Sequence, residues 1–147
     1  MRESFTANDE IVFPLIEKAI HLKVPVLIHS HTRNQSQPTL IGDLADHFPD
    51  ATIIMAHLGC TQYKDAMFVL RHCPNVSADT SCQPWLHRIL KQVIDVAGVE
   101  RIYYGSDAPL HTPEIEMMKI KLAGLNEDEM RLIMGENIAR LLNLKIG

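Results

Sequence analysis

Four short apolar segments occur at regular intervals along the chain. They are VPVLIH (24–29), ATIIMAH (51–57), NVSAD (75–79) and RIYYGSD (101–107), so their first residues are separated by 27, 24 and 26 positions. Three of them are apolar through their middles and do not alternate, which is typical of strands covered on both faces of a parallel sheet. NVSAD is only weakly apolar, and its place in the series predicts a strand as much as its composition does. The pattern predicts four parallel strands.

Helical periodicity fills the intervals between these segments. It predicts helices over 14–22, 38–48, 62–72, 84–97 and 113–123, and a last helix from residue 126 to the C-terminus. Asn126 and Glu129 have the spacing of a capping box at the start of that last helix. A βα repeat of about 25 residues implies parallel strands joined by right-handed crossovers. The predicted fold is α/β in a single domain over residues 1–147, either an open sheet or half of an eight-stranded TIM-type barrel.

Composition narrows the class of protein further. Of the 147 residues 46% are hydrophobic and 22% are charged, which is typical of a soluble globular protein, and the net charge of −4 gives no reason to expect a nucleic-acid partner. No apolar stretch reaches the roughly 18 to 20 residues of a membrane span, and the polar N-terminus does not resemble a secretory signal. Cys60, Cys73 and Cys82 lack CxxC spacing, which predicts free thiols and a cytoplasmic location. Any of the three could be a metal ligand, but we interpret them as buried or incidental thiols.

Residues able to bind a metal follow the ends of the predicted strands. His29, His31 and His57 lie at or just after two of them, Asp107 ends the fourth, and His111 follows in the next loop. The carboxyl edge of a parallel sheet is where α/β proteins build active sites. Imidazole and carboxylate are ligands of Zn²⁺ and similar divalent ions, which in enzymes activate a bound water. The sequence therefore predicts a metal site at this edge.

Each of these residues also has an ordinary structural interpretation. His29 or His57 alone would fit a buried histidine bonded to the backbone, and Asp107 alone would fit the cap of a turn. Their occurrence together at successive strand ends favours a site. We interpret Asp79, at the end of the third strand, as structural, because metal sites need few ligands.

The segments PVLIH, IIMAHLG and RIYYGSDAP, with GENIARLLNL near the C-terminus, resemble the amidohydrolase superfamily, in particular its branch of amidohydrolase-related hydrolases and decarboxylases. The resemblance implies a (β/α)8 barrel in which this chain forms strands five to eight and a C-terminal helix. It implies that His29 is the strand-five metal ligand. It also implies that His57 binds a second metal or transfers protons, and that Asp107 is a metal ligand or the base that activates the bound water. His31 is a further candidate ligand, while Asn137 and Arg140 serve packing.

The sequence departs from that family at its first strand. The family carries an H-x-H pair there, and nothing before the helix at 14 supplies it. His29-Ser30-His31 has the same spacing but follows a helix, so it aligns with strand five. We therefore expect a fragment, the product of a gene with a late start, or a half-barrel completed by association. The expected macromolecular partner is a second copy of the chain or a missing N-terminal half.

The resemblance implies a metal-dependent hydrolase that activates a metal-bound water against an amide, lactone or ester-like small molecule. The expected metal residues are His29, His57, Asp107 and His31, and Asp107 and His57 are the expected catalytic groups. The expected cofactor is a divalent ion, zinc first and manganese or another metal second. The alternatives are a metal-dependent decarboxylase of a small acid and a catalytically inactive half-barrel that acts as a binding module.

A half-barrel would also leave apolar surface uncovered. The first and fourth predicted strands would form two open edges without the bulges or charges that usually protect an edge, apart from Arg101. We expect Val26, Ile28, Ile54 and either Tyr103 or Tyr104 to project from the inner face of the sheet. Two copies pairing edge to edge would close an eight-stranded barrel and remove both edges.

Overall fold

The first helix and the first strand show how local sequence sets the elements. The computed structural model describes residues 5–31, 35–83 and 85–145. Helix α1 (Phe13–Leu22) has Pro14 in its first turn, where a missing N–H has no cost, and Lys23 ends it in a left-handed conformation. A 3₁₀ turn (Glu10–Val12) leads into it, capped by the side chain of Asp9. Strand β1 (Val26–Ile28) then follows directly.

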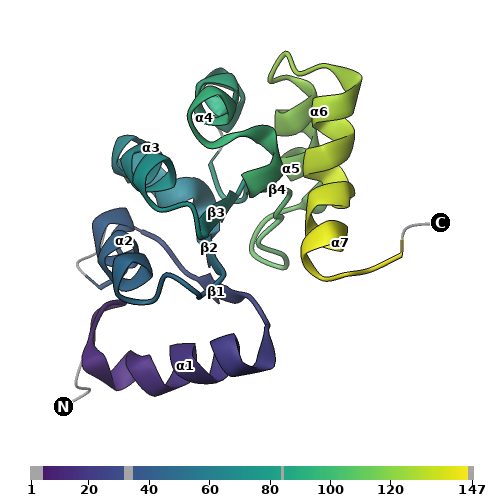
Figure 1. Ribbon diagram of the computed structural model, residues 1–147. Coiled ribbons are helices and arrows are strands. Elements are labelled where there is room, and N and C mark those ends of the chain that lie inside the picture. The colour runs from purple at the N-terminus through teal and green to yellow at the C-terminus, as the bar shows by residue number, and fades with distance from the viewer. Residues whose placement is uncertain (1–4, 32–34, 84, 146–147) are drawn as a thin grey trace.

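Four parallel strands form one sheet in the order of the chain. They are β1, β2 (Ile53–Met55), β3 (Val76–Asp79) and β4 (Ile102–Tyr103), and each pairs with the next. Between them lie α2 (Pro38–His47), α3 (Tyr63–His72) and α4 (Leu90–Ala97), while α5 (Pro113–Lys121), α6 (Glu127–Arg131) and α7 (Asn137–Leu141) follow β4. Figure 1 shows the strands at the centre and the helices around their outside, from α1 near β1 to α5–α7 near β4. The predicted α/β fold with a parallel sheet is confirmed.

Three predicted elements differ in detail. The predicted helix over 84–97 is divided into a 3₁₀ turn (Leu86–Arg88) and α4, and its first predicted residue, Pro84, lies outside the described residues. The last helix begins with the predicted capping box but passes through a π-helical segment (Leu132–Glu136) between α6 and α7. Strand β4 is only two residues long, because the next backbone N–H, that of Tyr104, donates to the carbonyl of Ile133 and leaves the ladder.

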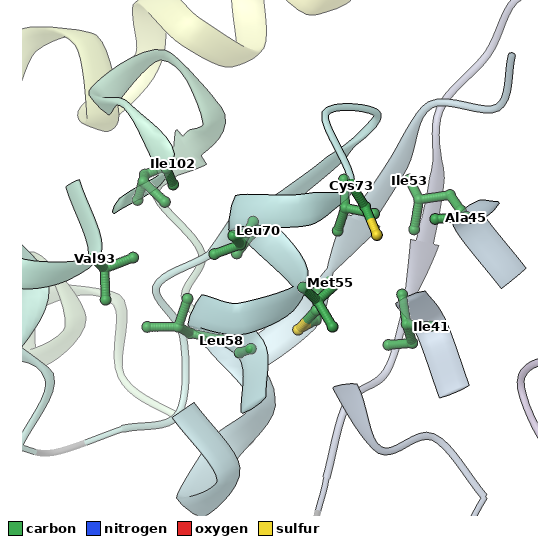
Figure 2. Close-up of a cluster of buried hydrophobic side chains, with 14 of the residues drawn as sticks. Ile41, Ala45, Ile53, Met55, Leu58, Leu70, Cys73, Val93 and Ile102 are labelled. Carbon is green, nitrogen blue, oxygen red and sulfur yellow. The ribbon is translucent and has the colours of Figure 1, made fainter. Parts of the chain in front are cut away.

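The core lies between the sheet and the helices. Its largest fully buried side chains come from β2 and β4 and from the helices and turns outside the sheet: Ile16, Ile41, Leu44, Ile53, Met55, Leu58, Leu70, Leu86, Leu90, Ile102, Ile120 and Ile133. Figure 2 shows Ile53 and Met55 of β2 close to Ile41 of α2, with Leu70 of α3 and Ile102 of β4 in the same cluster. Burial of this apolar surface fixes the outer face of the sheet against the helices.

The opposite, inner face carries Leu27, Ile54, Ser77 and Tyr103. The first three are paired across the sheet, and Leu27 is 62% exposed. The expectation that Val26 and Ile28 lie on this face was wrong. Val26 pairs with Ile53 and packs with it against the core. Because side chains alternate along a strand, residues 26 and 28 cannot share a face with Leu27 or with its partner Ile54.

Hydrogen bonds from Asn137 connect the C-terminal helical region to β4 and to the turn before it. The buried side chain of Asn137 donates to the carbonyls of Val99, at 2.7 Å, and Ile102, at 3.0 Å. This contact agrees with the packing role expected for Asn137. Among the described residues, no helix is long and apolar enough to cross a membrane.

Candidate active site

The alternation of side chains along β1 places His29 on the inner face of the sheet. His29 lies two residues after Leu27 and therefore continues the inner-facing row of β1. Its Nδ1 atom lies 3.1 Å from Nε2 of His57, and its ring is parallel to that of His31, with 5.8 Å between the centroids. The expected strand-end histidines of β1 and β2 are therefore neighbours in space.

His57 reaches the site because the backbone leaves the regular strand. If β2 continued, alternation would place His57 on the outer face with Ile53 and Met55. The backbone turns left-handed at His57 (φ 60°) and remains so through Leu58, Gly59 and Cys60. This turn brings the ring of His57 against that of His29. Such a run is unfavourable for side-chain-bearing residues, and it persists because surrounding contacts hold it.

Gly59 is required by the same turn. It has φ 73°, and a Cβ placed on it would lie 2.7 Å from Cγ of Pro38 and 2.9 Å from Cβ of Ala66. The glycine of the AHLG motif therefore allows the turn to pack directly on α2 and α3.

Asp79 and Ser81 fix both the backbone and the ring of His57. Oδ1 of Asp79 accepts the backbone N–H of His57 at 3.0 Å, the N–H of Ser81 at 2.9 Å and the hydroxyl of Ser81. Oγ of Ser81 also lies 2.7 Å from Nδ1 of His57. Because the serine proton is given to Asp79, the proton in the second contact comes from Nδ1 of the histidine. Neutral His57 therefore presents the lone pair of its Nε2 to the site. The structural role expected for Asp79 is this one.

The end of β3 supplies a further residue, Cys82, that was not among the predicted metal residues. Ligand atoms of His57, Cys82 and Asp107 lie within 4.8 Å of one another. Cys82 follows β3 by three residues, as Asp107 follows β4 by four. The position of Cys82 just after a strand end could have identified it as a candidate ligand. It was missed because a lone cysteine without a second one nearby is ordinarily an inert core residue.

A chain of polar and charged side chains leads away from Asp107. Nε2 of His111 lies 3.9 Å from Oδ2 of Asp107, and its Nδ1 lies 3.7 Å from Oε1 of Glu116. Glu116 forms a buried ion pair with Lys119 on α5, and Nζ of Lys119 reaches the carbonyl of Thr80 at 3.3 Å. No local pattern in the sequence indicates that these two charged residues are buried.

The environment favours the neutral forms of His29 and Cys82. Burial, followed by His57 and His31, lowers the pKa of His29 and outweighs the opposite effect of Asp107. Burial, Cys60 and Asp107 raise the pKa of the Cys82 thiol. A neutral imidazole retains a lone pair, and imidazole, thiol and carboxylate are the donor types that zinc sites use. The residues present therefore fit a divalent metal ion.

A cavity of about 580 Å³ lies beneath these groups, on the inner face of the sheet. Leu27, Ile54, Tyr103, Tyr104 and Ile138 form much of its apolar wall, and His29, His57 and Asp107 contribute polar groups. The cavity has the size and the mixed lining of a small-molecule site.

The structure thus gathers three of the four predicted metal residues, His29, His57 and Asp107, at one edge of the sheet. The fourth, His31, lies beside His29. His111 contacts Asp107, and Cys82 joins the group without having been expected there.

Comparison with known proteins gives the class. A family model described as amidohydrolase matches residues 2–144, so the chain belongs to the amidohydrolase family. No curated protein matches the chain closely enough to count as a relative.

Three solved structures illustrate the fold. An uncharacterized TIM-barrel protein from Bordetella bronchiseptica has 20% identity and a TM-score of 0.80, over 95% of this chain and 52% of its own. A dihydroxybenzoic acid decarboxylase from Polaromonas, with bound manganese and an inhibitor, 2-nitroresorcinol, has 15% identity and a TM-score of 0.74, over 97% and 56%. An amidohydrolase from Burkholderia multivorans with bound zinc has 14% identity and a TM-score of 0.73, over 93% and 58%. The chain thus spans little more than half the length of these proteins.

Proposed function

We propose that this chain is the C-terminal half of a metal-dependent hydrolase that acts on an amide, lactone or ester-like small molecule. The observation that carries the proposal is the meeting of His29, His57 and Asp107 at one sheet edge above a cavity. Membership of the amidohydrolase family supports it, as do the zinc and manganese ions in two proteins of similar fold.

In this proposal His29 and Asp107 hold a divalent ion, zinc or else manganese or another metal, and His31 is a further candidate ligand. When bound, the ion acidifies a water molecule and polarises the substrate carbonyl. Asp107 is the base that accepts a proton from the attacking water. His57 presents Nε2, with Nδ1 fixed by Ser81, and it either carries a proton to the leaving group or binds a second metal ion.

Metal content separates these roles. His29→Ala and Asp107→Ala should each remove bound metal, because each deletes a direct ligand. His57→Ala should retain metal while losing turnover if His57 carries protons, and should lose as much metal as the others if it is a ligand. The measurement is metal per chain by mass spectrometry, beside hydrolysis of an ester and amide panel. Full metal content in Asp107→Ala would overturn the proposal.

A decarboxylase of a small acid is the nearest alternative. It would use the same residues, with His57 delivering a proton to the carbon that loses its carboxylate. The similar fold of a dihydroxybenzoic acid decarboxylase supports this alternative. Release of CO2 from aromatic acids without ester hydrolysis would select this function. Absence of both activities, with little metal bound, would select an inactive binding module.

The location and partner of the chain are part of the proposal. Cys60, Cys73 and Cys82 are all free thiols, which supports a reducing cytoplasm. The exposed Leu27 on the inner face and the unpaired edges of β1 and β4 support completion of the barrel by a second copy or by an N-terminal half. The substrate is expected to be a small molecule bound in the cavity.

A further inference from the structure

We propose that Cys82 is a metal ligand, and that His57, Cys82 and Asp107 form a zinc position supplied entirely by this chain. The inference deepens the proposed function, since it rests on Asp107 facing a cation. It differs from the expected ligand set, because it adds a thiolate and does not draw on an H-x-H pair from a first strand.

The first support for the inference is the short distance between the ligand atoms of the three residues. Ligand atoms of the three residues all lie within 4.8 Å of one another in the described part of the chain. In a tetrahedral zinc site, bonds of about 2.0 to 2.3 Å place ligand atoms roughly 3.3 to 3.8 Å apart. A contraction of about 1 Å, within the range of a side-chain rotation, would complete the coordination. The fourth position would be left for water or for substrate.

The orientation of His57 is already that of a ligand. Its Nδ1–H donates to Ser81, and Ser81 is in turn held by Asp79, so Nε2 carries the lone pair. A metal-binding histidine ordinarily has its other nitrogen fixed by such a contact. Without a cation, the N–H at Nδ1 of His29 can donate to that lone pair, at 3.1 Å.

The three residues share an unusual backbone conformation. His57 (φ 60°), Cys82 (φ 73°) and Asp107 (φ 54°) are all left-handed, and Leu58 and Cys60 belong to the same left-handed turn as His57. Of the seven described non-glycine residues with positive φ, Lys23 and Asn143 follow the ends of helices, where this conformation is common. At the three strand ends no helix terminus accounts for it. Strained backbone of this kind accumulates at functional sites.

Donor chemistry selects the metal. A nitrogen, a thiolate and a carboxylate suit zinc, whereas manganese prefers oxygen donors. On binding, the thiol of Cys82 forms the metal–sulfur bond and releases one proton to solvent.

Cobalt(II) titration of the chain tests the inference, because cobalt replaces zinc and a cobalt–thiolate bond gives a near-ultraviolet charge-transfer band. The band is expected in the wild-type chain and lost in Cys82→Ser. It should persist in the matched control Cys60→Ser, a buried neighbouring thiol. Zinc affinity, measured by competition with a chromogenic chelator, should fall more than about tenfold in Cys82→Ser and stay unchanged in Cys60→Ser.

A second measurement does not depend on the variant folding. Zinc should protect Cys82 of the wild-type chain from alkylation, as read by peptide mass spectrometry, while the reactivity of the buried thiol of Cys73 should not change with zinc. Bound cobalt without a charge-transfer band, a band that survives Cys82→Ser, or unprotected Cys82 would overturn the inference. If metal then still depends on His29 and Asp107, the proposed function stands. If no metal binds at all, both fail.

Discussion

The carboxylate of Asp79, at the end of β3, accepts the backbone N–H of His57 in the turn after β2, at 3.0 Å. This cross-strand contact holds a left-handed turn that would otherwise be unfavourable, and the same oxygen orients Ser81 against the imidazole. One buried carboxylate therefore holds the path of the chain and, through Ser81, determines that Nε2 of His57 faces the site. Geometry around the site depends on a residue that is not itself a ligand.

Removing that carboxylate should loosen the site and the fold together. Asp79→Ala leaves the buried N–H groups of His57 and Ser81 without their acceptor, so we expect a loss of about 2 to 4 kcal/mol in the free energy of unfolding. Asp79→Asn keeps one acceptor oxygen and should lose less. Urea unfolding measures both. Equal stability of Asp79→Ala and wild type would show that the turn does not need this contact.

Gly105→Ala should disturb the same carboxylate from the other side. A Cβ on Gly105 would lie 2.9 Å from Cγ of Asp79, which three hydrogen bonds prevent from moving away. We expect a destabilisation of about 1 to 3 kcal/mol and weaker metal binding. Gly135→Ala is the matched control, because nothing lies within 4 Å of its added methyl group. Thermal unfolding that shifts equally in both variants would contradict the argument.

Arg101 should stabilise the fold rather than protect an edge. Its guanidinium donates to the carbonyls of Leu70, Cys73, Val76 and Ala97, and so joins the ends of two helices to β3. Arg101→Met should cost about 3 kcal/mol, since several part-buried carbonyls lose their donor. Arg101→Lys should recover only part of this, because an ammonium group cannot reproduce the planar fork. Denaturant unfolding, with a methionine at the exposed Arg88 as control, provides the measurement.

Cys73 should make stability depend on pH in the alkaline range. Burial, followed by Asp46, raises the pKa of its thiol to about 11 from an ordinary value of 9.0. The unfolded chain therefore releases this proton first, and stability should decline as pH rises from 9 towards 11, by about 2 kcal/mol in all. Cys73→Val should show a smaller decline over that window. Parallel pH profiles for the two proteins would contradict the assigned burial effect.

Association should follow from the open edges of the sheet. β1 and β4 are its two edges, and Leu27 projects 62% exposed from the inner face beside one of them. We expect a concentration-dependent dimer in sedimentation at micromolar concentration, or a stable complex with a separately supplied N-terminal half. Leu27→Glu should weaken association roughly tenfold or more, whereas Leu15→Glu, at an exposed apolar position of α1, should not. A monomer with no concentration dependence would refute the expectation.

Much of the fold was predictable because it depends on local periodicity. The apolar segments and the helical spacing between them gave four parallel strands, their order and the approximate helix ends. Local chemistry also determined particular ends, such as the capping box of Asn126 and Glu129. Positions just past strand ends directed attention to His29, His57 and Asp107, because the carboxyl ends of parallel strands meet at one edge.

Other features were decided only by tertiary structure. The register of β1 on β2 turned Leu27 inward and Val26 outward, and no local property of these similar apolar side chains distinguishes the two faces. The left-handed turn that aims His57 depends on Asp79, which is 22 residues away. Cys82 joins the site because β3 lies between β2 and β4, and the Glu116–Lys119 pair is buried because α5 packs against the turn after β3. The sequence alone determined which residues stand at strand ends. Contacts between distant segments decided which of their atoms meet, since those contacts set the backbone angles and the burial on which the chemistry depends.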